Sequence, residues 1–286
     1  MSLGEATTNC APISNKSFST SLHLFPELNF FTSPIAYLSN FSRRLLIKVL
    51  RQGPIPQHVG FVMDGNRRFA KKIQVQTGEG HYMGFQKLEE VLEICLELGI
   101  KVVTVYAFSI ENFKRPKEEV DTLMNLARKK LRELYENNDV VSKYGVSIRI
   151  LGNKTLLPED LLIEMEKAED ATKRNNRTIL NLCCPYTSRD EIATAVRKVV
   201  IQVEKGETNI SEIDEKLLDS KLYTNGCPPL EILIRTSGET RLSDFLLWQC
   251  HEKCNIHFVN CYWPEFSLWE MLPIILDYQR GFLGRR

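Results

Sequence analysis

Asp64-Gly65-Asn66-Arg67-Arg68 is a short segment whose side chains could bind a diphosphate together with a metal ion. Asp64 offers the hard oxygen ligand that Mg²⁺ prefers, and the guanidinium groups of Arg67 and Arg68 match the geometry of phosphate oxygens. Gly65 lets the backbone approach a ligand closely, and the N–H groups at a helix start bind anions. A plainer interpretation is that Asp64 caps a helix and the arginines face solvent. The segment by itself leaves both interpretations open.

A second segment, from Ala107 to Pro116, places two hydrogen-bonding side chains close to a cation. Ser109 and Asn112 are the hydrogen-bonding residues, and Arg115 is the cation. The alternative here is again capping, with Pro116 starting the next helix.

A third segment, Ile234 to Ser243, carries two arginines six residues apart around a turn. Arg235 and Arg241, with the hydroxyl of Ser243, would form a diphosphate clamp if they converge. The alternative is a surface loop with solvated charges. It is disfavoured because Arg235 directly follows the apolar run Ile232-Leu233-Ile234.

The elements that must position these segments alternate between short apolar runs and amphipathic stretches, which indicates a parallel sheet covered by helices. We expect strands at Val59–Met63, Val102–Phe108, Val146–Leu151, Ile179–Cys183, Ile232–Arg235 and Ile256–Phe258. We expect helices near Gly84–Leu98, Lys117–Glu136, Pro158–Lys173, Ser188–Glu204, Asp214–Leu222, Asp244–Glu252 and Leu268–Gln279. The fold class is therefore α/β, a single layered domain with a central, mostly parallel six-stranded sheet. Ligands of such sheets collect where strands end, and all three segments follow a strand.

The remainder of the chain predicts an extension and a short helix before this domain. Residues 1–40 are rich in Ser and Thr and lack periodicity, which suits a disordered or targeting extension. Residues 41–52 have the pattern of an amphipathic helix with basic flanks, which could lie on a membrane surface or pack on the domain. Residues 53–286 would form the domain itself, and no segment is apolar over the length that a membrane-spanning helix needs.

Composition and motif content exclude several classes of function. The formal net charge is +1, so no global field favours nucleic acid. The chain contains neither Gly-x-x-x-x-Gly-Lys-Ser/Thr nor Gly-x-Gly-x-x-Gly, which removes support for ATP and NAD binding. Eight cysteines lack paired Cys-x-x-Cys spacing and are interpreted as free thiols in a reducing compartment. Cys250 and Cys254, four residues apart on an expected helix, are a weak metal candidate beside ordinary buried thiols.

The chain from about Pro56 to Phe266 resembles the cis-prenyltransferase family, the undecaprenyl and dehydrodolichyl diphosphate synthases. The eukaryotic dehydrodolichyl branch is resembled most closely, because of Arg67 in place of the bacterial-type glycine, Cys184-Pro185-Tyr186-Thr187-Ser188-Arg189 and Leu222-Tyr223-Thr224. Several long motifs of the whole family also occur in the family's order. They are His58-Val59-Gly60-Phe61-Val62-Met63-Asp64-Gly65-Asn66-Arg67-Arg68, Gly80-His81, Tyr106-Ala107-Phe108-Ser109-Ile110-Glu111-Asn112-Phe113, Arg235-Thr236-Ser237-Gly238-Glu239, Arg241 through Gln249, and Trp263-Pro264-Glu265-Phe266.

The resemblance implies sequential condensation of isopentenyl diphosphate onto an allylic diphosphate such as farnesyl diphosphate. Asp64 would bind Mg²⁺, and Arg235, Arg241 and Ser243 would hold isopentenyl diphosphate. Ser109 and Asn112 would assist loss of its C2 proton, and His81 would lie near the phosphates unless it is a loop histidine without a role. The allylic diphosphate would be held by Gly65, Asn66, Arg67, Arg68 and Arg115. An apolar tunnel for the product would be lined by Phe85, Leu88, Leu92, Leu96, Leu123, Leu126, Leu131 and Leu134, or these residues are ordinary core.

The sequence departs from the bacterial-type homodimers of this family at two places. Asn255 stands near the position of a glutamate that helps to bind Mg²⁺ in those enzymes. The C-terminal Arg-x-Gly that they lend across the dimer is missing, because Arg280 and Gly281 are adjacent. The resemblance therefore implies a heteromer with a Nogo-B-receptor-type subunit of the same fold, peripheral to the cytoplasmic face of the endoplasmic reticulum membrane. The alternatives are a non-catalytic scaffold subunit, which the intact set of polar residues disfavours, and a trans-prenyltransferase, whose Asp-rich motifs are missing.

Overall fold

The computed structural model describes residues 34–136 and 139–283. The expected extension at residues 1–40 lies mostly outside this range. The first helix, α1 (Pro34–Leu50), begins seven residues before the start expected at residue 41. The chain divides into two units between Arg44 and Leu45, and the second unit contains the sheet. Among the described residues, no helix is long and apolar enough to cross a membrane.

Six strands form one sheet in the order β3-β4-β2-β1-β5-β6, and every neighbouring pair is parallel. The buried apolar runs that suggested these strands are explained by burial of the central strands on both faces, as parallel sheets require. The expected strands are confirmed to within a residue or two. Their bounds are β1 (His58–Val62), β2 (Val102–Tyr106), β3 (Val146–Leu151), β4 (Thr178–Cys183), β5 (Ile232–Arg235) and β6 (Asn255–Phe258).

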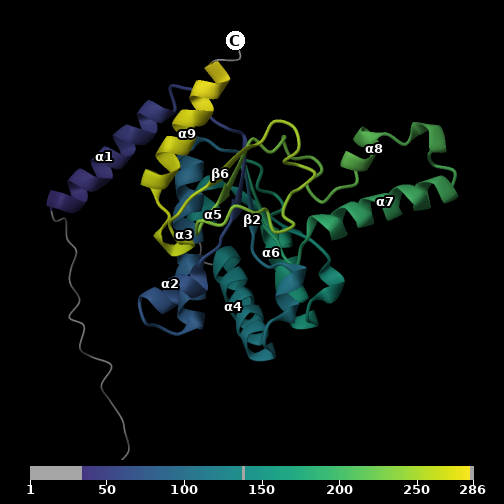
Figure 1. Cartoon of the computed structure of the whole chain (residues 1–286), viewed down its shortest axis with the longest axis horizontal. Coiled ribbons are helices and arrows are strands. Elements are labelled where there is room, and N and C mark those ends of the chain that lie inside the picture. Colours follow the sequence, from purple (N-terminus) through teal and green to yellow (C-terminus); the bar gives the residue numbers. More distant parts are fainter. Residues whose placement is uncertain (1–33, 137–138, 284–286) are drawn as a thin grey trace, which may run out of the picture. The chain divides into compact units, whose positions relative to one another are not determined.

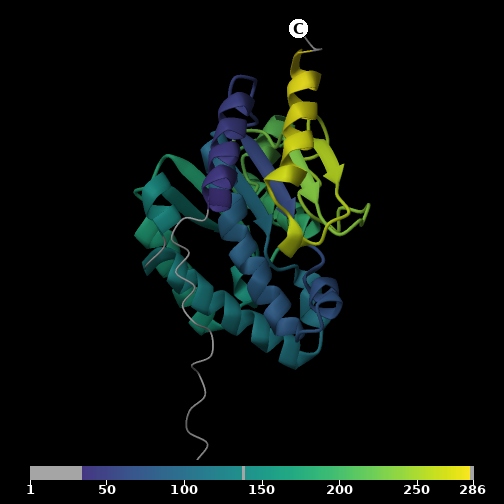
Figure 2. The same ribbon diagram turned by 90° about the vertical axis from the view of Figure 1, so that its left-hand side faces the viewer.

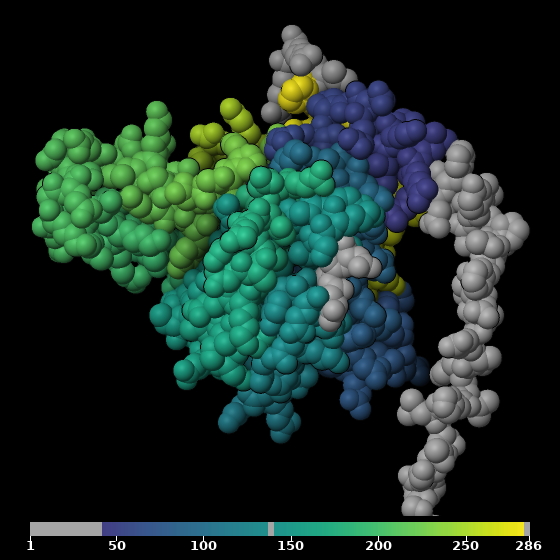
Figure 3. All heavy atoms as spheres, turned by 180° about the vertical axis from the view of Figure 1, so that it is seen from behind, coloured from purple at the N-terminus to yellow at the C-terminus, as the bar shows by residue number. Residues whose placement is uncertain are grey.

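Helices cover one face of the sheet, and α3 and α9 lie in the same layer (Figures 1 and 2). A smaller cluster under the irregular segment before β6 covers the other face, with Phe245 and Leu246 fully buried at its centre. The helix α7 and the short α8 extend away from the sheet (Figures 1 and 3). The helical bounds are α2 (Asn66–Lys72), α3 (Thr77–Leu98), α4 (Lys117–Glu136), α5 (Asp139–Tyr144), α6 (Glu159–Thr172), α7 (Ser188–Glu204), α8 (Glu215–Asp219) and α9 (Leu268–Leu283), with 3₁₀ turns η1 (Ile110–Lys114), η2 (Lys154–Leu156), η3 (Ile210–Glu212) and η4 (Trp263–Glu265).

The second half of α1 packs on the domain. Ile47 and Leu50 are 6% and 2% exposed and join the main core, whereas Leu45 and Val49 are 52% and 60% exposed. The side-chain amide of Gln279 on α9 donates to the Leu50 carbonyl at 2.7 Å. The amphipathic pattern of this helix therefore reflects packing on the domain along one stripe, and it leaves a second apolar pair in solvent.

The helix expected at Asp244–Glu252 is wrong, because this segment forms irregular turns. Ser243, Asp244 and Leu246 have φ values of 49°, 61° and 47°, in the left-handed region that a right-handed helix excludes. The apolar residues that suggested a helical face instead fill the smaller core, where Phe245 and Leu246 are 0% exposed. Cys250 and Cys254 consequently do not share a helix face, and all cysteines in the described residues are free thiols.

Candidate active site

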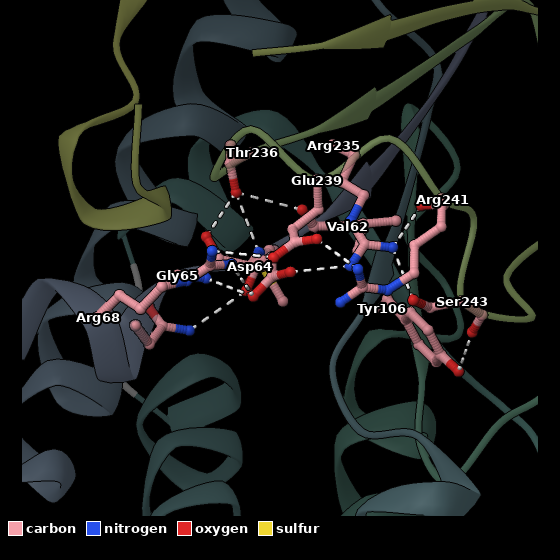
Figure 4. A network of polar contacts seen from close by, with 12 residues as sticks. Val62, Asp64, Gly65, Arg68, Tyr106, Arg235, Thr236, Glu239, Arg241 and Ser243 are labelled. Carbon is pink, nitrogen blue, oxygen red and sulfur yellow. Dashed lines mark hydrogen bonds and ion pairs between the residues drawn. The ribbon is translucent and has the colours of Figure 1, made fainter. Parts of the chain in front are cut away.

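Asp64 lies two residues after β1, and its backbone is fixed by hydrogen bonds to Thr236, which follows β5 (Figure 4), and to Trp263 of η4. The Asp64 N–H donates to Thr236 Oγ1 at 3.0 Å, and that hydroxyl donates to the Asp64 carbonyl at 2.7 Å. The Trp263 N–H donates to the same carbonyl at 3.0 Å. The parallel register that places Val62 beside Arg235 brings these two strand ends together. The position of the Asp64 backbone is therefore set by segments 172 residues or more away along the chain.

The Asp64 carboxylate faces cations and does not cap a helix. Arg235 Nη2 donates to Asp64 Oδ2 at 2.8 Å, and Arg68 Nη2 lies 3.5 Å from Oδ1. The Gly65 N–H donates to Oδ1 at 2.7 Å. The N-cap of α2 is Gly65, whose φ of 103° suits glycine and which makes no side-chain cap. The capping interpretation of Asp64 is therefore wrong.

Arg235 is the most buried cation of the site, with its side chain 3% exposed. Its Nη1 donates to Ser243 Oγ at 2.7 Å and to the Arg241 carbonyl. Its Nε is buried without a hydrogen-bond partner in the described residues. The exposed Arg241 and Arg68 both pair with Glu239, Arg68 at 2.9 Å. The surface-loop interpretation is therefore wrong for Arg235, which contacts Asp64 and Ser243, whereas the Arg241 side chain is 65% exposed and pairs with Glu239.

Ser109 and Asn112 cap each other's backbone after β2. Ser109 Oγ accepts from the Glu111 N–H at 3.2 Å, and Asn112 Oδ1 accepts from the Ser109 N–H at 3.0 Å. The capping alternative is thus correct for this pair. Both side chains also line the cavity described below, and each keeps a donor group, the Ser109 hydroxyl and the Asn112 amide.

Glu119 on α4 interacts with three further polar residues of the site. Its Oε1 accepts from Arg115 at 3.0 Å and lies 3.8 Å from Arg67 Nη1 and 4.0 Å from His81 Nε2. Burial lowers the pKa of His81 to about 4, and the positive charges of Arg115 and Arg67 add to this effect against the carboxylate of Glu119. His81 is therefore neutral near pH 7, and it lies on α3, not in a loop.

Close packing of α3 on α2 fixes Asn66. A Cβ at Gly84 would lie 2.2 Å from Asn66 Oδ1, and a Cβ at Gly80 would lie 2.5 Å from the Asn66 carbonyl. Only glycine allows these approaches. The Asn66 Oδ1 atom is itself buried without a hydrogen-bond partner in the part of the chain that is described.

These side chains surround the polar end of a cavity of about 700 Å³, a volume typical of ligand sites. Helices α3 and α4 line its apolar part. Of the residues expected in a tunnel, Phe85, Leu88, Leu123, Leu126 and Leu131 line the cavity. Leu92, Leu96 and Leu134 belong to the closed core instead. The cavity thus joins a cationic, hydrogen-bonding end to an apolar wall, which suits an amphiphile with an anionic head.

The comparisons with known proteins bear directly on this geometry. The prenyltransferase family model of undecaprenyl diphosphate synthases matches residues 62–282, most of the described chain. The chain belongs to the cis-prenyltransferase family. It is 53% identical over 236 residues to the human dehydrodolichyl diphosphate synthase complex subunit DHDDS, covering 82% of this chain and 71% of that one. It is 45% identical over 246 residues to a dehydrodolichyl diphosphate synthase complex subunit of Schizosaccharomyces pombe, covering 86% and 93%.

A solved cis-prenyltransferase-like structure confirms the fold. Lavandulyl diphosphate synthase from Lavandula x intermedia, crystallised with dimethylallyl diphosphate, aligns with a TM-score of 0.71 and 31% identity. The alignment covers 78% of this chain and 94% of that chain. The relatives are prenyl-transferring synthases, so the chain is an enzyme of this type, and the scaffold alternative is disfavoured.

The structure brings together the residues expected to serve this cis-prenyltransferase. Ten of them line the cavity: Asp64, Asn66, Arg67, His81, Ser109, Asn112, Arg115, Arg235, Arg241 and Ser243. Gly65 and Arg68 lie behind them, against Asp64. Glu119, Glu239 and Thr236 were not expected. A signal existed for Glu119, which lies four residues after Arg115 at the spacing of a helical ion pair.

Asn255 is not placed to assist Asp64. It begins β6 opposite Ile232, which is itself opposite Val59 of β1. Asp64 lies five residues further along, roughly 16 Å at the rise of a strand. Asn255 of this chain therefore lies at the amino edge of the sheet, away from Asp64.

Proposed function

We propose that this cis-prenyltransferase adds isopentenyl diphosphate repeatedly to farnesyl diphosphate and makes a long-chain dehydrodolichyl diphosphate for dolichol synthesis and protein glycosylation. The network of Asp64, Arg235 and Ser243 at the polar end of an apolar cavity carries this proposal. The names of the human and fission yeast relatives support the product class.

The allylic diphosphate would bind where α2 begins and its chain would enter the apolar cavity. Arg67 and Arg115 would contact the phosphates, with Gly65, Asn66 and Arg68 shaping the site. Neutral His81 could donate one hydrogen bond without adding charge. The complex of the related lavandulyl diphosphate synthase with dimethylallyl diphosphate supports an allylic diphosphate as ligand.

Isopentenyl diphosphate would bind to Arg235, Arg241 and Ser243. The allylic C–O bond breaks, diphosphate leaves, and the isopentenyl double bond attacks the allylic carbon. The C2 proton is then lost, for which Ser109 and Asn112 lie on the neighbouring loop. The guanidinium groups of Arg67 and Arg115 would stabilise the negative charge that develops on the leaving diphosphate.

Mg²⁺ fits Asp64 as a site with a single protein carboxylate. The Asp64 side chain is 29% exposed, and in the described residues no group of three or more His, Cys, Asp or Glu could hold a metal. Mg²⁺ commonly uses one or two carboxylates and completes its shell with water and substrate phosphate. When bound, the ion would neutralise charge on the leaving diphosphate.

The active assembly would be a heteromer at the cytoplasmic face of the endoplasmic reticulum. Arg280 and Gly281 are adjacent near the end of α9, so a Nogo-B-receptor-type subunit would supply the missing Arg-x-Gly. The human and fission yeast relatives are named as complex subunits. The exposed apolar Leu45 and Val49, beside Lys48 and Arg51, support peripheral membrane contact.

Replacement of Asp64 tests the proposal most directly. Incorporation of labelled isopentenyl diphosphate is measured for the chain with and without its partner subunit. We expect Asp64→Ala to lower turnover by about 100-fold or more while partner binding survives. Asp170→Ala is the matched control, because Asp170 is 74% exposed on α6 and pairs only with Lys173 in the described structure. Unchanged turnover in Asp64→Ala would refute the assignment, and full activity of the chain alone would refute the heteromer.

A further inference from the structure

The turn that carries Ser243 has an unusual backbone. Ser243, Asp244 and Leu246 all have positive φ values, 49°, 61° and 47°. Residues other than Gly, Asn and Asp rarely adopt this left-handed conformation, and a β-branched or leucine side chain disfavours it. Contacts from outside the turn must therefore hold it in place.

Three of those contacts come from the first turn of α7, and Asp244 makes two of the three. The Ser188 N–H donates to the Asp244 carbonyl at 2.8 Å, and the Arg189 N–H donates to Asp244 Oδ1 at 3.1 Å. The Leu247 N–H donates to Ser188 Oγ at 2.8 Å. The free N–H groups at the start of a helix favour a carboxylate partner, so α7 and the turn satisfy each other.

The Arg189 side chain extends this link to a third loop. Its Nε donates to Asp244 Oδ2 at 2.7 Å, and its Nη2 lies 3.7 Å from Glu111 beside the Ser109–Asn112 cap. Asp244 is 12% exposed and Arg189 is 73% exposed. Screening by solvent makes the guanidinium contact the weaker part, and the backbone contacts the stronger part.

The conformation of the turn that α7 stabilises sets the position of the Ser243 hydroxyl. Tyr106 donates to the Ser243 carbonyl at 3.2 Å and stacks on Phe245 at 4.5 Å. In this position the Ser243 hydroxyl oxygen accepts a hydrogen bond from Arg235 Nη1 at 2.7 Å (Figure 4). A rotation of the backbone at Asp244 would move this hydroxyl away from Arg235, because the two residues are adjacent.

We propose that Asp244 is a positioning residue for isopentenyl diphosphate, which it serves by holding Ser243 against Arg235 through the start of α7. Asp244 need not contact the substrate. The inference rests on the proposed function, in which Ser243 and Arg235 bind that diphosphate.

Steady-state kinetics with each substrate varied separately tests this role in the complete enzyme complex. We expect Asp244→Ala to raise the KM for isopentenyl diphosphate about tenfold or more, with the KM for the allylic diphosphate changed less than about twofold. Asp244→Asn keeps an acceptor for the Arg189 N–H and tolerates positive φ, so we expect a rise of about two- to threefold. Arg189→Met should resemble Asp244→Asn.

Two controls separate positioning from general destabilisation. Asp214→Ala removes the N-cap of α8, where Asp214 accepts from the Leu217 N–H at 2.8 Å, and should leave both KM values unchanged. Arg197→Met removes another exposed arginine of α7, one that contacts Thr194, and should also be silent. If Asp244→Ala does not fold, Asp244→Asn and Arg189→Met decide the question.

Two outcomes would overturn the inference: an unchanged KM for isopentenyl diphosphate in the folded Asp244 variants, or equal rises in both KM values. Ser243→Ala separates this from the proposed function. If Ser243→Ala also leaves the KM for isopentenyl diphosphate unchanged, the assignment of this loop fails. If Ser243→Ala raises that KM and the Asp244 variants do not, only the positioning role fails.

Discussion

The Thr236 hydroxyl makes two hydrogen bonds to the Asp64 backbone: it accepts from the Asp64 N–H and donates to the Asp64 carbonyl. Thr236→Val keeps the shape of the side chain and removes both bonds. Without the hydroxyl, the Asp64 carbonyl retains the Trp263 N–H at 3.0 Å and the Asp64 N–H retains the Val62 carbonyl at 2.9 Å, so the loss is two hydrogen bonds and not an unpaired backbone group. Each such hydrogen bond contributes about 0.5–1.5 kcal/mol to stability.

Two measurements follow for Thr236→Val. In urea titration we expect the free energy of unfolding to fall by about 1–3 kcal/mol with an unchanged m-value. We also expect kcat to fall by about 10- to 100-fold, because a shift of about 1 Å in a catalytic group can have this effect.

Thr236→Ser is the matched control, since it keeps the hydroxyl and loses one methyl group, worth about 0.8 kcal/mol. The valine variant should therefore lose much more activity than the serine variant. Equal kcat values for the two would refute the view that this hydroxyl holds Asp64 in place.

Two further predictions concern the histidines and the helix contact behind Asn66. Burial lowers the pKa of His81 and of His58 to about 4 from 6.5, so the unfolded chain binds protons first as the pH falls. Their contribution to stability is therefore complete above about pH 6.5 and is lost progressively as the pH falls toward 4. The free energy of unfolding is measured as a function of pH, and His81→Gln should make its slope between these pH values smaller. An unchanged slope would contradict the prediction. Gly84→Ala should raise the KM for the allylic diphosphate about tenfold, because the new Cβ would displace Asn66 Oδ1 at 2.2 Å. Gly78→Ala on the same helix is the control, because its new Cβ would lie 3.7 Å from the nearest heavy atom. It should leave the KM for the allylic diphosphate unchanged and can raise the free energy of unfolding by up to about 1 kcal/mol. Equal effects of the two substitutions on this KM would contradict a role for the contact between Gly84 and Asn66.

Local patterns were sufficient where burial and spacing act along the chain. The apolar runs of β1 and β5 mark strands that are buried throughout, and the helix α7 was expected at its observed bounds, Ser188–Glu204. The same patterns failed at Asp244–Glu252. There Phe245 and Leu246 are apolar because they fill a core, and the turn is held by hydrogen bonds from α7 that no local pattern records.

The sequence also did not indicate which charged residues far apart along the chain form ion pairs. Glu239 joins Arg68 to Arg241, although 171 residues separate Glu239 from Arg68. The position of Asn255 in space was likewise not indicated by the sequence, and its register places it at the edge of the sheet away from Asp64.

The sequence by itself determined the family, the order of the six strands along the chain and the three polar segments, because residue types and spacing along one chain are sufficient to define them. Only the tertiary structure decided that Asp64 faces Arg235 and Arg68 and does not cap α2, and that Ser109 and Asn112 cap each other beside the cavity. The physical reason is the parallel register. It places the ends of β1, β2 and β5 at one edge of the sheet, where hydrogen bonds between distant segments select one conformation for each loop.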